Sequence, residues 1–175
     1  MKRPFALVLL VSVTLCWPRI LESQSGQLKS AGSRPRSEIV FVCEHGAALS
    51  VVSAAYFNKI ARQEHLPLHA IARGANPQKE IAISARQGLT ADGVPFAPQT
   101  PQPLSIKEAA QARRVIAFCP LPARYSKLAP VESWSDVPPT AAGYALARDA
   151  ILRHLHELFG QLKNKDKDKD DDRSY

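Results

Sequence analysis

Residues 38–50 have the sequence Glu38-Ile39-Val40-Phe41-Val42-Cys43-Glu44-His45-Gly46-Ala47-Ala48-Leu49-Ser50. The first five residues form a short, largely β-branched and apolar run, which predicts a buried strand. The residues from about Ser50 to Glu64 repeat their apolar positions at helical spacing and predict a helix. Cys43 is therefore expected at the carboxyl end of a strand, before a loop of small residues and the start of a helix.

This placement of a cysteine suits anion chemistry. The loop amides and the dipole of the following helix can hold an oxyanion and also lower the pKa of a thiol. The loop contains no lysine or arginine. His45 is a candidate donor to an anion, with an exposed loop histidine as the alternative. Cys43 itself has the alternative role of a small buried hydrophobic residue.

The rest of the chain alternates between strand and helix patterns. Further strands are predicted at 68–73, 114–119 and 131–134. Helices are predicted near 79–89, after a capping box at Ser105, and in a long last segment capped by Thr140. This alternation predicts an α/β fold in three layers, with a four-stranded parallel sheet flanked by helices. Ligands of such sheets bind beyond the carboxyl ends of the strands, where Cys43, Arg73 and Cys119 are expected.

The two ends of the chain are predicted to lie outside this domain. Residues 1–25 resemble a signal peptide with a basic start and a short apolar stretch, cleaved after Ser25, which predicts a periplasmic or secreted protein. The alternative is an uncleaved membrane anchor, although a spanning helix usually needs about 20 apolar residues. Residues 26–37 are predicted to be a flexible lead-in, 38–162 the folded domain, and 163–175 a disordered charged tail.

Composition limits the classes of partner. The chain has 175 residues and a formal net charge of +7, which loss of residues 1–25 lowers by two. This mild positive charge suits a small anionic ligand, whereas scattered basic residues with few aromatics argue against nucleic-acid binding. No membrane span is expected after processing. The histidines lack metal-ligand spacing, so neither a metal nor another cofactor is predicted. Of three cysteines, Cys43 and Cys119 lie in the predicted domain.

Several segments resemble the low-molecular-weight protein tyrosine phosphatases, whose fold the thioredoxin-coupled arsenate reductases share. The resemblance covers about residues 37–160 and is carried by the following segments: Phe41-Val42-Cys43, the loop ending in Ser50, Ala54-Ala55-Tyr56-Phe57-Asn58, Ile71-Ala72-Arg73-Gly74, the strand ending in Cys119, and Trp134-Ser135-Asp136-Val137-Pro138. It implies phosphate-monoester hydrolysis or arsenate reduction by a cysteine, acting on a small oxyanion or phosphoester.

The resemblance also implies a role for individual residues. Cys43 would be the nucleophile, Ser50 would stabilise its thiolate by a hydrogen bond, and Gly46 would supply a positive backbone torsion. Asp136 would protonate the leaving oxygen, with a simple turn residue as the alternative. Cys119 matches the first resolving cysteine of the arsenate reductases, but their second has no counterpart. The oxyanion would lie against these loop residues: Glu44, His45, Gly46, Ala47, Ala48 and Leu49.

Two departures from the family pattern weaken the prediction of activity. Leu49 occupies the position of the arginine that grips two oxygens of the anion. Val137 separates Asp136 from Pro138. We hypothesise that Arg73, at the end of the neighbouring strand, replaces the missing arginine in space. The alternative is that Arg73 pairs with a surface carboxylate.

Three functional interpretations follow from these residues. The first is an enzyme of the phosphatase or arsenate reductase type with an altered loop. The second is a non-catalytic oxyanion-binding protein. The third is an exported, redox-responsive protein in which Cys43 and Cys119 form a disulfide.

Overall fold

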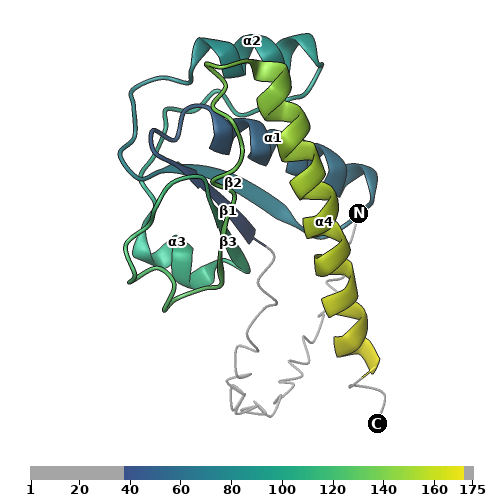
Figure 1. Ribbon diagram of the computed structural model, residues 1–175. Coiled ribbons are helices and arrows are strands. Elements are labelled where there is room, and N and C mark those ends of the chain that lie inside the picture. The colour runs from purple at the N-terminus through teal and green to yellow at the C-terminus, as the bar shows by residue number, and fades with distance from the viewer. Residues whose placement is uncertain (1–37, 172–175) are drawn as a thin grey trace, which may run out of the picture. The chain divides into compact units, whose positions relative to one another are not determined.

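The computed structural model describes residues 38–171, and the side chains of residues 38–164. The predicted signal peptide and lead-in (1–37) lie outside the described residues, as do residues 172–175. Four strands form one sheet: β1 (Glu38–Cys43), β2 (His69–Gly74), β3 (Arg114–Ala117) and β4 (Val131–Ser133). All neighbours are parallel, in the order β2-β1-β3-β4, so the predicted four-stranded parallel sheet is confirmed (Figure 1).

Helices cover both faces of this sheet. They are α1 (Leu49–Gln63), α2 (Ile83–Ala91), α3 (Ile106–Gln111) and α4 (Tyr144–Asp171). In Figure 1, α1 and α4 lie on one face of the sheet and α3 lies on the other. The predicted three-layer α/β architecture is therefore confirmed. Within residues 38–171, no helix is long and apolar enough to cross a bilayer.

The side chains of β1 alternate between two apolar cores. Ile39 and Phe41 belong to the larger core under α1 and α4, whereas Val40 and Val42 belong to the smaller core on the α3 side. Successive side chains of a strand point to opposite faces of a sheet. This alternation assigns Cys43 to the α1 side, where the helix that follows the loop begins.

Two helices begin later than the sequence pattern predicts. The segment before α2 is held in a non-helical path because the amide of Ala82 donates to the carbonyl of Ala47, at 2.9 Å. The last helix starts at Tyr144 because Gly143 has a φ of +147°, which a right-handed helix does not allow. Thr140 is not its N-cap and instead accepts a hydrogen bond from Ser84. The capping box at Ser105 is present as predicted.

The last helix also ends later than predicted. It continues to Asp171, beyond residue 162, where the sequence predicts the folded domain to end. Inside the domain, Asp92 ties α4 to α1 and α2, because it accepts hydrogen bonds from Tyr56 and Tyr144 and pairs with Arg148. The hydrogen bond from Tyr56 is the main reason why the pKa of Asp92 lies below its usual range.

Candidate oxyanion site

Cys43 and Ser50 meet at the carboxyl edge of the sheet. The Cys43 Sγ lies 3.2 Å from the Ser50 Oγ, and the two residues are 8% and 0% exposed. A hydroxyl donating to a sulfur stabilises the thiolate over the thiol. The structure therefore brings together the predicted nucleophile and its predicted hydrogen-bond donor.

The carbonyl groups of the loop between them are bound by a second segment of the chain. Residues 75–82, which lead from β2 to α2, donate four backbone hydrogen bonds to the loop. The pairs are Ala75 to Cys43 at 3.0 Å, Asn76 to Glu44 at 2.7 Å, Gln78 to His45 at 3.1 Å and Ala82 to Ala47 at 2.9 Å. These four hydrogen bonds fix the conformation of the loop and direct its carbonyl oxygens towards residues 75–82.

The amide groups of the loop are consequently available to a ligand. Within residues 38–171, the N–H groups of residues 44–50 have no hydrogen-bond partner. In a planar trans peptide the N–H points away from the C=O of the preceding residue. The amides of Glu44, His45, Gly46 and Ala48 therefore point away from residues 75–82. Consecutive free amides beside a helix N-terminus form an anion-binding concavity.

Gly46 is required for the shape of this loop. Its φ is +63°, and a Cβ added to it would lie 2.8 Å from the backbone nitrogen of Gly74. The converse also holds, because a Cβ on Gly74 would lie 2.9 Å from the nitrogen of Gly46. The predicted positive torsion at Gly46 is confirmed, and the structure adds a close contact between the two backbones.

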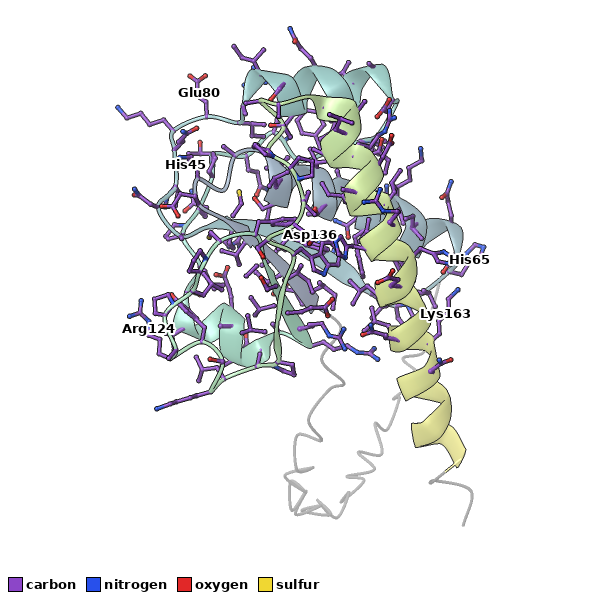
Figure 2. All side chains as sticks on the ribbon, in the orientation of Figure 1. His45, His65, Glu80, Arg124, Asp136 and Lys163 are labelled. Atoms are coloured by element: carbon purple, nitrogen blue, oxygen red, sulfur yellow. The ribbon has the colours of Figure 1, made fainter. Side chains whose placement is uncertain are left out.

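Leu49 begins α1 and lies partly buried against the larger apolar core. A leucine supplies neither charge nor a hydrogen-bond donor to the loop. His45 is exposed, and its Nδ1 lies 3.4 Å from the carbonyl oxygen of Asn76. Figure 2 shows His45 on the side of the molecule opposite to His65 and Lys163. The described loop therefore offers an anion its backbone N–H dipoles but no arginine side chain.

Arg73 lies on the other face of the sheet from Cys43. It is in register with Val42, one residue before Cys43, and so points towards α3. Its Nε and one terminal nitrogen donate to Glu108 at 3.0 Å and 2.5 Å, and the other donates to the carbonyl of Ala72. The structure thus places Arg73 in a pair with a carboxylate, the alternative considered above, and does not bring its guanidinium to the loop.

The ion pair with Arg73 makes stability depend on pH. Burial alone would raise the pKa of Glu108, but hydrogen bonds from Arg73 and Ser105 outweigh it and hold the pKa at about 2, against 4.5 when unperturbed. A carboxyl group whose pKa is lower in the folded than in the unfolded chain stabilises the fold fully at a pH above its unfolded pKa. This stabilisation is lost as the pH falls towards its folded pKa.

We therefore expect Glu108→Gln to lower the free energy of unfolding by about 2 kcal/mol at pH 7, after allowance for solvent screening. The difference from the parent should shrink as the pH falls from about 4.5 towards 2. Urea unfolding of both proteins at pH 7, 4 and 2.5 measures it. Glu157→Gln, an exposed change on α4, serves as the control. A difference that does not vary with pH would contradict the prediction.

Asp136 is engaged by a histidine. Its Oδ2 lies 2.9 Å from the Nε2 of His154, whose ring stacks on Trp134 with centroids 4.6 Å apart. This hydrogen bond is the main reason why the pKa of Asp136 lies below its usual range. A general acid must carry a proton at the working pH. In this arrangement Asp136 favours its ionised form, which is unfavourable for protonating a leaving group.

Cys119 follows β3, the strand beside β1 on the side away from β2. Burial raises the pKa of its thiol to about 11, and the charges of Glu44 and Cys43 act in the same direction. Cys119 is therefore a neutral thiol at pH 7 and a weak nucleophile. Cys43 and Cys119 are both free in the structure. Residues 38–164 bring together no group of three or more potential metal ligands.

Three residues that shape this site are not predicted by the sequence patterns. Glu108 belongs to the capping box predicted at Ser105, and nothing local in the sequence links it to Arg73. His154 is one of the histidines that lack metal-ligand spacing, and no sequence pattern marks it as the partner of Asp136. Gly74 ends β2, and its role in the site is its close backbone contact with Gly46. The signal for Gly74 was present, because two glycines at neighbouring strand ends indicate a close approach of backbones.

No protein-family model and no curated protein matches the sequence. Solved structures do match. The low-molecular-weight protein tyrosine phosphatase from Bacillus subtilis is 20% identical, with a TM-score of 0.61 over 73% of this chain and 97% of that one. The protein tyrosine phosphatase from Entamoeba histolytica is 15% identical, with a TM-score of 0.62 over 74% and 98%.

An arsenate reductase in its phosphate-binding state is also similar, at 16% identity and a TM-score of 0.59 over 71% of this chain and 98% of that one. At these identities the similarity establishes the fold. The predicted resemblance to the low-molecular-weight phosphatases and arsenate reductases is confirmed at that level.

Proposed function

We propose that the protein binds a small tetrahedral oxyanion, such as phosphate or arsenate, in the loop of residues 44–50 above the thiol of Cys43. The observation that carries this proposal is the set of loop amides without a partner, held in place by four hydrogen bonds from residues 75–82. Such a site needs no charged side chain to attract an anion, because oriented amides and a helix N-terminus carry partial positive charge.

Three features of the site support binding with weak turnover. Leu49 stands where an arginine would bind two oxygens of the anion, and the loss of one such donor lowers a catalytic rate by about 10²–10³. Asp136 is held ionised by His154, and general acid catalysis is worth about 10²–10⁴. Arg73 is occupied by Glu108. The proposed anion site is therefore better suited to hold an oxyanion than to transfer a phosphoryl group.

Phosphate titration of the reduced full-length protein tests the proposal. We expect dissociation constants between about 1 µM and 1 mM by calorimetry, a range that corresponds to about 8 to 4 kcal/mol of binding free energy. Cys43→Ser should bind within a few-fold of the parent, because the amides make the contacts. Arg73→Ala should also bind like the parent. Absence of binding well above millimolar phosphate would refute the proposal.

A second candidate is slow cysteine-dependent hydrolysis of phosphate monoesters, favoured by the contact between Cys43 and Ser50. The Cys43 thiol would lose its proton to solvent, and its sulfur would bond to phosphorus as the ester P–O bond breaks and the leaving oxygen takes a proton from water. A second water would then attack phosphorus, break the S–P bond and release phosphate and the free thiol. Trapping of a phosphocysteine on Cys43 would support this candidate. Unchanged aryl-phosphate turnover in Cys43→Ser would exclude it.

The export and the redox role of the cysteines remain proposals. The redox role is supported by two free thiols, Cys43 and Cys119, and by the contribution of the Cys43 charge to the raised pKa of Cys119, whereas export rests on the sequence of residues 1–25 alone. A count of free thiols in protein taken directly from its native compartment, before any reduction, tests the redox role, and the mass of the chain from that compartment tests the loss of residues 1–25. Two free thiols in each chain that has lost residues 1–25 would contradict the redox role.

A further inference from the structure

A groove of about 500 Å³ runs along the outer edge of β2. One wall is α1, and the other is the proline-rich segment of residues 95–101. The groove shares Gly46 with the oxyanion loop, but neither Cys43 nor Ser50 lines it. Its volume falls within the range of sites for small organic molecules, about 300–1,000 Å³.

The wall formed by α1 is a single stripe of the helix. Apart from the adjacent Ala54 and Ala55, neighbouring members of the stripe are three or four positions apart, which places them on one side of the helix. They are Val51, Ala54, Ala55, Asn58 and Arg62. Ala54 and Ala55 leave space because their side chains are small, while Arg62 places a cation at the end of the stripe where α1 terminates. The groove is therefore apolar along most of this wall and basic at one end.

The backbone edge of β2 offers little to an added strand. The side chain of Asn58 pairs with both the N–H and the C=O of Ala70, each at 2.8 Å. Gly74 is paired with residues 102 and 104, and the carbonyl of Ala72 accepts from Arg73. The outward N–H of Ala72 has no hydrogen-bond partner among residues 38–171. Addition of a strand needs a row of free groups, so this edge fits a small molecule better than a peptide.

The charges that line the groove have one sign. Arg62, His69 and Arg73 line it, and no carboxylate does. The pleat of β2 directs the side chains of His69 and Arg73 towards the α3 face, so Arg62 is the cation on the α1 wall. Arg73 is already paired with Glu108. Arg62 and His69 form no ion pair within the part of the chain whose side chains are described. An anionic group near Arg62 would therefore find a complementary charge without competition from a neighbouring acid.

We propose that this groove binds a small amphipathic anion, with its apolar body against Ala54 and Ala55 and its anionic group at the end formed by Arg62. This site is separate from the proposed oxyanion site at Cys43 and does not depend on it. The shape of the groove and the sign of its charge together define the class of ligand.

Titration of the full-length protein with decanoate and with decanol, followed by amide NMR, tests the proposal. Decanoate should bind with saturation and shift the signals of the Ala72 amide and the Asn58 side chain, whereas decanol should bind at least about tenfold more weakly. Arg62→Gln should weaken decanoate binding about tenfold, as expected for loss of a charged partner, without changing that of decanol. Arg153→Gln, an exposed arginine on α4, should change neither.

Ala97→Trp provides an independent test, because residue 97 is exposed and the change should not disturb folding. The indole should fill the groove and abolish decanoate binding, while Cys43→Ser leaves it intact. The proposal is overturned if neither ligand binds, if decanol binds as tightly as decanoate, or if decanoate binding survives both Arg62→Gln and Ala97→Trp.

Discussion

Leu49→Arg is expected to raise kcat/KM for an aryl phosphate by about 10²–10³, because a guanidinium would supply the bidentate contact that the loop lacks. Leu49 is the first residue of α1, directly beside the free amides, so the new side chain starts at the rim of the proposed site. Some packing against the apolar core is lost, and the free energy of unfolding should fall by about 1–2 kcal/mol. Steady-state assays of the reduced protein, with unfolding measured in parallel, test both statements.

Three control variants separate the contributions. Leu49→Met keeps an apolar side chain and should show no gain. Leu49→Lys adds a positive charge but not the planar guanidinium that binds two oxygens at once, so its gain in kcat/KM should be smaller than that of Leu49→Arg. Combining Leu49→Arg with Cys43→Ser should abolish activity if the reaction uses the thiol. A folded Leu49→Arg protein that is no more active than the parent would show that the missing arginine does not limit turnover.

Gly46→Ala is expected to destabilise the protein by about 2–5 kcal/mol and to abolish phosphate binding. Two effects combine at this position: a positive φ, which costs a residue with a side chain about 1–2 kcal/mol, and an added Cβ 2.8 Å from the backbone of Gly74, which costs about 1–3 kcal/mol more. The neighbouring atom belongs to the backbone, so it cannot move away as a flexible side chain would.

The chain contains a matched control for each effect. Gly93 has a φ of +61° with no atom near an added Cβ, so Gly93→Ala should show the torsional cost alone, about 1–2 kcal/mol. Gly74 has the close contact without a positive φ, so Gly74→Ala should show the steric cost alone. Urea unfolding and phosphate titration measure the series. Equal destabilisation in Gly46→Ala and Gly93→Ala would contradict the steric contribution of the Gly74 contact.

Local patterns were sufficient for most of the fold. The apolar run of β1, the helical spacing of α1 and the capping box at Ser105 were all present where they were predicted. The start of the last helix was predicted wrongly because Thr140 has the chemistry of an N-cap. Its hydroxyl is instead engaged by Ser84, 56 residues earlier in the chain, and the torsion of Gly143 sets the start.

The sequence predicted only those parts of the candidate site whose residues lie close together along the chain. Cys43, Gly46 and Ser50 lie within one strand, loop and helix start, so their contact follows from the order of the residues. Residues 75–82 could not be recognised as the support of the loop, because backbone hydrogen bonds between distant segments leave no sequence pattern. The same limit applies to Asp136, whose partner His154 lies on α4.

The sequence alone determined the strand, the loop of small residues with a thiol at its start, and the leucine at the position of the family's arginine. Only the tertiary structure decided what surrounds them. Arg73 is one residue out of register with Cys43, so the pleat of the sheet directs it to the opposite face, where Glu108 binds it. Periodicity along a chain fixes its elements, whereas the partner of a charged side chain depends on which elements fold against it.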